Sequence, residues 1–198
     1  MAYVVGFFIF LIISAIIVAI NNNANKDNSQ KQLKEKIENF DSLIHFNIDD
    51  STLPSISIDK DNYIIYQYSY KDFLLNDIKK RNIKDIIRCE MLADSEIIQT
   101  TNRGSQLAGA IIGGAVFGPV GAIVGGVTGK KTNKKQNKSY EIRIYYTTPE
   151  SPLDVIKLEN DPKKSTNLSQ NIEDTALKIY ATIESLINLE RQKNQQQI

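Results

Sequence analysis

An uninterrupted apolar run opens the chain. The eighteen residues from Tyr3 to Ile20 carry no charge, and thirteen of them are Val, Ile, Leu or Phe. A run of this length is typical of a membrane-spanning helix, and it favours insertion into a bilayer by about 4 to 8 kcal/mol. A secretory signal peptide is the competing interpretation, but no Lys or Arg precedes the run and no clean cleavage site follows it. The pattern predicts an uncleaved transmembrane anchor over residues 1–23.

A polar segment, residues 24–52, follows the anchor. Asn21 to Gln30 is rich in Asn, a composition that predicts a flexible tether. Apolar residues then recur at spacings of four, three and four, as on one face of a short amphipathic helix, with Ser29 as its candidate cap. The residues on that face are Leu33, Ile37, Phe40 and Ile44.

Beyond Leu53 the apolar period changes from helical to two, which indicates β-strands. The predicted strands are Ile56–Ile58, Tyr63–Tyr70, Ile83–Leu92, Ser95–Thr101, Tyr140–Tyr146 and Leu153–Leu158. A final amphipathic helix is expected from about Leu168 to Gln192, with Asn167 and Gln170 as a capping pair. Its apolar stripe consists of Ile172, Ala176, Ile179, Ile183, Leu186 and Ile187. Residues 53–198 therefore predict an α+β domain of antiparallel strands and one covering helix.

A second apolar block interrupts this domain between Gly104 and Gly129. It contains no charge and holds nine of the ten glycines of the chain. Glycines four residues apart share one helical face, where two backbones can approach closely. The glycines expected to pack in this way are Gly109, Gly113, Gly114, Gly118, Gly121, Gly125 and Gly129. A flexible loop is the alternative, although flexible linkers are polar and this block is rich in Ile and Val. A phosphate-binding P-loop is excluded because its glycine spacing and its Ser or Thr after the Lys are missing.

The place of this block within the domain predicts how it meets a membrane. A single crossing would leave the strands before and after it on opposite sides of the bilayer. A bend at Phe117, Gly118 and Pro119 would instead give two arms of about 13 residues, roughly 20 Å each, which are too short to span. We therefore expect a re-entrant glycine-zipper hairpin. The lysines directly behind it are candidates for contact with anionic lipid, and a solvated loop is their ordinary alternative. They are Lys130, Lys131, Lys134, Lys135 and Lys138.

The order of these elements resembles known architectures. Strands followed by one amphipathic helix resemble a pleckstrin-homology (PH)-like domain from Leu53 to Arg191. Two strands, an apolar glycine block ending in Gly129-Lys130-Lys131, and the strand from Tyr140 are similar to a recurrent bacterial membrane-anchored family whose PH-like domain is interrupted by a glycine-rich segment. This resemblance implies a small β sandwich or partial barrel in a membrane setting, and it supplies no catalytic residues.

Composition narrows the chemistry. The chain has 198 residues, a net charge of +1, one Cys and one His, which excludes a disulfide scaffold and a cysteine-based zinc site and disfavours nucleic-acid binding. No sequence motif gives His45 a catalytic partner, and Cys89 alternates with Ile87 and Met91 as a core residue does. Tyr66, Tyr68 and Tyr70 share one strand face, an ordinary place for tyrosine. We expect neither an enzyme, nor a cofactor, nor a bound metal.

Lysines set the expected orientation. Lys26, Lys31, Lys34 and Lys36 follow the anchor, so the positive-inside rule places the bulk of a single-pass protein in the cytoplasm at the cell membrane. The preferred hypothesis is a non-enzymatic module that binds lipid headgroups or a membrane-protein partner. The alternative is a membrane-perturbing effector, such as a toxin or a phage-defence or exclusion protein, whose GxxxG hairpins associate into homo-oligomers.

Overall fold

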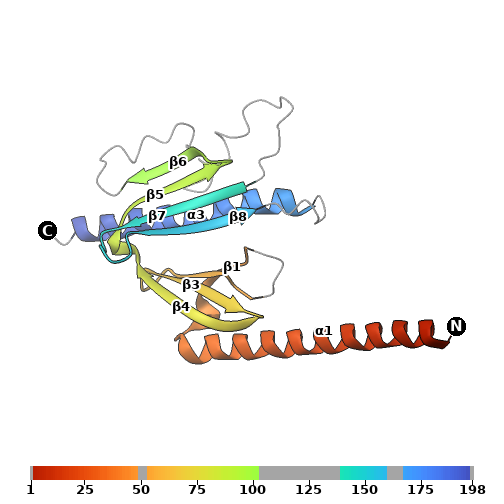
Figure 1. Cartoon of the computed structure of the whole chain (residues 1–198). Coiled ribbons are helices and arrows are strands. Elements are labelled where there is room, and N and C mark those ends of the chain that lie inside the picture. Colours follow the sequence, from red (N-terminus) through yellow and green to blue (C-terminus); the bar gives the residue numbers. More distant parts are fainter. Residues whose placement is uncertain (1, 49–52, 103–138, 160–166, 197–198) are drawn as a thin grey trace. The chain divides into compact units, whose positions relative to one another are not determined.

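The computed structural model describes residues 2–48, 53–102, 139–159 and 167–196. Within these ranges it contains two antiparallel four-stranded sheets and two long helices (Figure 1). The elements are α1 (Ala2–Lys36), η1 (Phe40–Ser42), β1 (Ile44–Phe46), β2 (Ile56–Asp59), β3 (Ile64–Lys71), β4 (Leu74–Asn82), η2 (Ile83–Asp85), β5 (Ile86–Ala93), β6 (Glu96–Asn102), β7 (Ser139–Tyr146), β8 (Leu153–Glu159) and α3 (Asn167–Gln195). The predicted α+β class is confirmed.

The described residues form two compact units. One consists of Met1–Asp59 with Tyr66–Lys80, and the other of Lys60–Ile65 with Arg81–Ile198. The first contains α1 and most of the sheet whose strand order is β1-β2-β3-β4. The second contains α3 and the sheet whose order is β6-β5-β7-β8.

Helix α1 continues without a break from the apolar run through the polar segment (Figure 1). The flexible tether predicted at Asn21–Gln30 is therefore wrong. Asn is only a moderately poor helix former, and here tertiary contacts decide the conformation, since the side chains of Ser29 and Leu33 are fully buried. Ser29 is consequently an interior helix residue and not a cap.

The short amphipathic helix predicted next is only partly correct. Leu33, Ile37 and Phe40 are buried as expected, but α1 ends at Lys36, and a 3-10 turn follows from Phe40. Ile44 starts β1 and is exposed, whereas its neighbour Leu43 is buried. The four-residue spacing therefore identified most of the buried positions but not where the helix ends.

The end of α1 packs against the tyrosine-bearing face of β3. Leu33, Ile37, Phe40, Leu43 and Tyr68 form one buried apolar cluster. The partly buried side chains packed around it are Tyr66, Tyr70, Leu75 and Ile78. Burial raises the pKa of Tyr68 to about 12, so this tyrosine stays neutral at physiological pH. The three tyrosines thus serve as packing surface for the helix.

The second sheet follows the predicted alternation. Tyr140, Ile142, Ile144 and Tyr146 of β7 are buried, while the residues between them are only half-buried. Helix α3 covers this buried face, packing against β5, β7 and β8 (Figure 1). All six residues predicted for its apolar stripe, Ile172, Ala176, Ile179, Ile183, Leu186 and Ile187, are buried.

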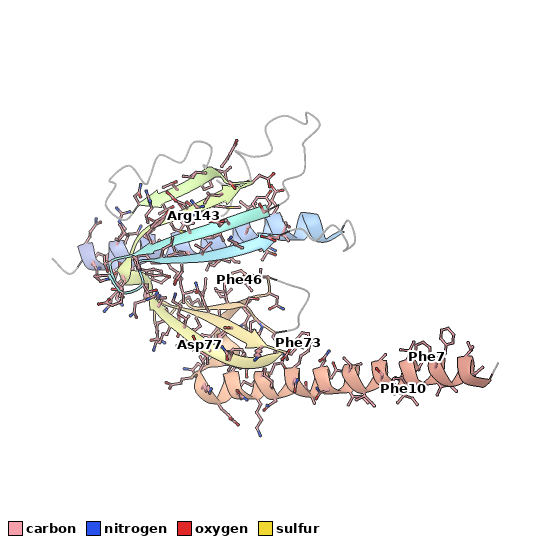
Figure 2. The ribbon with its side chains drawn as sticks, viewed as in Figure 1. Phe7, Phe10, Phe46, Phe73, Asp77 and Arg143 are labelled. Carbon is pink, nitrogen blue, oxygen red and sulfur yellow. The ribbon has the colours of Figure 1, made fainter. Side chains whose placement is uncertain are left out.

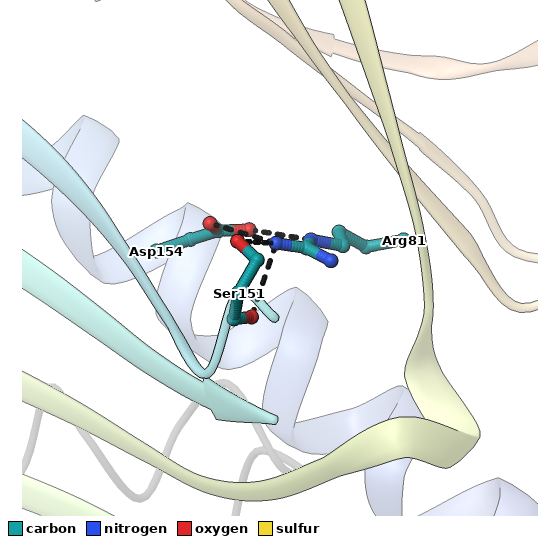
Figure 3. A network of polar contacts seen from close by, with 3 residues as sticks. All are labelled: Arg81, Ser151 and Asp154. Carbon is teal, nitrogen blue, oxygen red and sulfur yellow. Dashed lines mark hydrogen bonds and ion pairs between the residues drawn. The ribbon is translucent and has the colours of Figure 1, made fainter. Parts of the chain in front are cut away.

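A buried ion pair anchors Arg81 to β8 (Figure 3). The Arg81 guanidinium donates from Nε to Asp154 Oδ2 at 3.0 Å, and its Nη2 donates to both the carbonyl and the hydroxyl of Ser151. The guanidinium carbon also lies 4.8 Å from the centre of the Tyr146 ring. The pair is nearly inaccessible to water, so removing Arg81 would leave an uncompensated charge on Asp154.

Candidate functional site

The exposed half of α1 is the first functional feature of the structure. Every Val, Ile, Leu and Phe between Val4 and Ile20 is exposed, Phe10 by 67%. This helix is long and apolar enough to cross a membrane. Figure 2 shows Phe7 and Phe10 near the amino-terminal end of the helix, far along it from the sheet of the same unit. No described residue covers these side chains, so they suit an apolar environment outside the chain.

The other half of α1 holds the turn between β3 and β4. Ser29 Oγ donates to the carbonyl of Phe73 at 2.6 Å and accepts from the Leu75 amide at 2.8 Å. One turn earlier, Asn25 Nδ2 donates to the carbonyl of Asp72 at 3.1 Å. Lys26 Nζ lies 4.8 Å from the centre of the Phe73 ring, within the range of a cation–π contact. We call this set of contacts the helix–hairpin clamp.

The clamp supports a strained turn. Asp72 and Phe73 have φ of 50° and 63°, the left-handed conformation that two-residue hairpin turns require at both central positions. Gly, Asn and Asp tolerate this conformation, but a bulky residue such as Phe rarely adopts it. The bonds from Asn25 and Ser29 hold both turn carbonyls and so help to maintain the conformation.

The second feature is the sheet from which the glycine-rich segment departs. Strands β6 and β7 both pair with β5 in antiparallel fashion, so they run parallel to each other. Strand β6 ends with Asn102 opposite Arg88, whereas β7 begins at the other end of β5, with Tyr140 opposite Ala93. The residues on either side of the segment therefore belong to one sheet, about 17 Å apart along β5.

Polar contacts hold the two ends of the sheet from which the glycine-rich segment leaves and to which it returns, which we call its roots. Asp94 and Ser139 exchange two bonds, from the Asp94 amide to the Ser139 carbonyl at 3.1 Å and from the Ser139 amide to Asp94 Oδ1 at 3.0 Å. At the other root, Thr101 Oγ1 donates to Glu184 Oε1 at 2.6 Å and lies 2.7 Å from Tyr180 Oη. A hydroxyl has one hydrogen, so the Tyr180 hydroxyl donates to Thr101. The three side chains are buried.

The residues predicted to form the membrane hairpin lie outside the described residues. This applies to the seven zipper glycines, to the bend at Phe117, Gly118 and Pro119, and to the five lysines from Lys130 to Lys138. Their packing, bend and lipid contact stay predictions. The side chains of Asn167 and Gln170, the predicted capping pair, are likewise not described.

The reactive side chains are placed as structural residues. His45 Nδ1 lies 2.6 Å from Ser57 Oγ, a partner that no motif suggested. Ser57 is fully buried, so a substrate could not reach its hydroxyl, and desolvation lowers the pKa of His45. Cys89 is fully buried, and burial raises its thiol pKa. Among the described residues, no group of three His, Cys, Asp or Glu side chains could hold a metal ion.

The helix–hairpin clamp was missed because its residues look like linker residues. In the structure, the buried and half-buried positions of the polar part of α1 recur every three or four residues. They are Asn22, Asn25, Lys26, Ser29, Gln32 and Leu33. Five of these six are polar, and exposed positions such as Asn23 and Gln30 carry the same amide side chains, so the sequence alone does not mark this stripe.

Comparison with known proteins identifies the β domain. The family model described as a glycine zipper containing PH domain matches residues 41–160, which span β1 to β8 and the glycine-rich segment. No curated protein and no solved structure matches the chain. The matched region is more than half of the chain, and its two antiparallel sheets and following helix are consistent with a PH-like domain. The chain belongs to the family of PH domains that contain a glycine zipper.

Proposed function

We propose that this protein is a non-enzymatic, membrane-anchored module that binds lipid headgroups or a membrane-protein partner. The exposed apolar half of α1 carries the proposal. A soluble protein would leave thirteen Val, Ile, Leu and Phe side chains in water, at a cost of about 25 cal/mol for each Å² of apolar surface. A bilayer removes that cost, and α1 is then the anchor of a single-pass protein.

Lysine placement supports a cytoplasmic location for the β domain. Lys26, Lys31, Lys34 and Lys36 follow the apolar run within sixteen residues. By the positive-inside rule, lysines clustered at the carboxyl end of a helix favour a cytoplasmic location for that end. All four lysines belong to α1 itself, and Lys26, about 9 Å beyond Ile20, is the one nearest the membrane surface.

The sheet topology supports a glycine segment that dips into the membrane without crossing it. Both roots, Asn102 and Ser139, belong to the sheet β6-β5-β7-β8, so the segment leaves and returns on one side of a bilayer. The roots are offset by about 17 Å along β5 and lie on the strands at either side of it, so the two arms of a tightly packed zipper would need the residues flanking the glycines to converge. The five lysines behind the zipper would then meet anionic headgroups, each contributing about 1 kcal/mol.

Vesicle flotation of a chain that begins at Asn21 tests this proposal. Without the anchor, the glycine segment and its lysines should still bring part of the folded protein to vesicles of phosphatidylglycerol and phosphatidylcholine. Replacing Lys130, Lys131, Lys134, Lys135 and Lys138 with Gln should reduce flotation. Replacing Lys60, Lys84 and Lys157, exposed lysines of the described β domain, should not. A folded, fully soluble chain would overturn lipid binding by the glycine segment and its lysines.

The same vesicles discriminate the second candidate, a membrane-perturbing effector. Four GxxxG pairs in the segment favour association between chains through the glycine face. Release of an entrapped dye by the full chain, abolished in Gly113→Leu and Gly121→Leu variants, would favour the effector. Binding without release supports the scaffold-like module.

A further inference from the structure

We propose that the tip of the β3–β4 hairpin, Lys71 to Leu74, is a second membrane contact, held by the helix–hairpin clamp at the level of the lipid headgroups. The ligand is the headgroup region of the bilayer that α1 spans. The inference thus deepens the proposed function and rests on its anchor. It is independent of the glycine-rich segment.

The clamp fixes the height of the hairpin along α1. A helix rises 1.5 Å per residue, so Asn25 and Ser29 lie about 7.5 Å and about 13.5 Å beyond Ile20, where the apolar run ends. The polar region of a bilayer occupies about 5 to 8 Å on each side of its hydrocarbon core. The Asp72 carbonyl bonded to Asn25 therefore lies at the outer boundary of the headgroups, and the Phe73 carbonyl bonded to Ser29 lies about 6 Å beyond it.

The hairpin points its tip toward the membrane. Along α1, the residue nearest the apolar run, Asn25, contacts the turn at Asp72. Farther from the apolar run, Leu33 and Ile37 belong to the cluster that includes Tyr68, which lies on β3 three residues before Lys71. The strands thus recede from the membrane as α1 does, and the turn is the closest part of the hairpin. Figure 2 shows Phe73 at this end of the hairpin, beside the helix.

The side chains at the tip suit an interfacial position. Leu74 is 39% exposed, Phe73 is half-buried and Lys71 is exposed. Turns ordinarily favour Gly, Asn or Asp, so Phe73 at a central position of the turn, followed directly by Leu74, is not explained by turn preference. A lipid interface rewards the apolar pair, and lipid phosphates can pair with Lys71 and Lys26. Asp72 also lies in the turn, so the attraction to anionic lipid is modest and apolar contact is the larger contribution.

Site-directed fluorescence quenching of the full chain in phosphatidylcholine–phosphatidylglycerol vesicles tests the proposal. An environment-sensitive fluorophore is attached to Leu74→Cys and, separately, to Lys71→Cys, both exposed positions that tolerate labels. Native Cys89 is fully buried, so it does not compete for the label. The matched control is Asp41→Cys, an exposed position of the same unit. The Asp41 carboxylate forms an ion pair with Lys34, with Nζ and Oδ1 2.8 Å apart. Lys34 lies about 21 Å beyond Ile20 along α1, so Asp41 is farther from the membrane than the hairpin tip.

We expect lipids spin-labelled at the headgroup to quench both tip labels and to leave the Asp41→Cys label bright. A label at Ile12→Cys, read with lipids spin-labelled in the acyl chain, reports whether α1 is inserted. If Ile12→Cys is quenched while both tip labels behave like Asp41→Cys, the hairpin contact is overturned and the anchor stands. If Ile12→Cys is not quenched, the anchor and this inference both fall.

Discussion

At the scale of single residues, two hydroxyl groups join segments far apart in the chain. Ser29 bonds the backbone of a hairpin turn more than forty residues away, and Thr101 bonds two residues of α3. Each hydroxyl is buried and serves as donor and acceptor at once. Such a group is more consequential than its small size suggests, because its removal leaves two polar partners without their hydrogen bond.

Thr101 offers the sharper test, since it lies at the end of β6, three residues before the glycine-rich segment begins at Gly104. Thr101→Val keeps the shape of the side chain but leaves the Glu184 carboxylate and the Tyr180 hydroxyl without their partner. We expect the free energy of unfolding to fall by about 1 to 3 kcal/mol, measured by urea denaturation of the β domain within the full chain.

Thr182→Val is the matched control for this measurement. Thr182 is half-buried on α3, and its hydroxyl donates to the Lys178 carbonyl of the same helix in a solvent-exposed bond. A surface change of this kind should stay within about 0.5 kcal/mol. Equal losses in the two variants would contradict a structural role for the buried network.

At the scale of secondary-structure elements, the continuity of α1 distinguishes this protein from a domain on a loose tether. Spin labels at Phe10→Cys and Lys31→Cys, both exposed, should give a narrow distance distribution near 32 Å by pulsed electron resonance. Asn23→Pro breaks the helix between them, since proline removes a donor and clashes with the preceding turn. It should broaden the distribution, whereas Asn23→Ala should leave it unchanged. A broad distribution in the labelled chain that keeps Asn23 would show that a flexible tether is present.

The sequence predicts those elements in which apolar residues alternate or recur according to which side is buried. Alternation in Tyr140–Tyr146 and the stripe on α3 gave the correct buried faces, because one side of each element packs against the core. Strand β4 was missed because Leu74–Asn82 is rich in Asn, Asp and Lys and does not alternate. The strand predicted from Ile83 begins only at Ile86, after a 3-10 turn, and the three-residue β1 was also missed.

One part of the candidate site could be predicted from the sequence and the other could not. Hydropathy identifies α1 as a membrane-spanning candidate, since that property depends on composition alone. The helix–hairpin clamp depends instead on bonds from Asn25 and Ser29 to backbone carbonyls. Backbone acceptors leave no trace in the sequence, so no pattern pairs Ser29 with Phe73.

At the scale of the whole molecule, lysines lie beside both apolar segments. One group follows the apolar run within α1, and the other follows the glycine block. If both groups face the same anionic leaflet, the anchor and the glycine segment enter the membrane from one side, and the anchor raises the local concentration of a segment that inserts only weakly by itself. The near-neutral total charge conceals this arrangement.

Membrane topology tests that arrangement directly. Gln30→Cys lies ten residues beyond the apolar run on α1, and Asn137→Cys lies two residues before β7, between Lys135 and Lys138 of the second lysine group. Both cysteines should react with a membrane-impermeant maleimide only after the cytoplasmic face is opened, and native Cys89 should stay unlabelled because it is fully buried. A single crossing by the glycine segment would expose one introduced cysteine on each side. That pattern would require Asn137 to be separated by the bilayer from β5, which pairs with both β6 and β7, so it would contradict the sheet as well as the re-entrant hairpin.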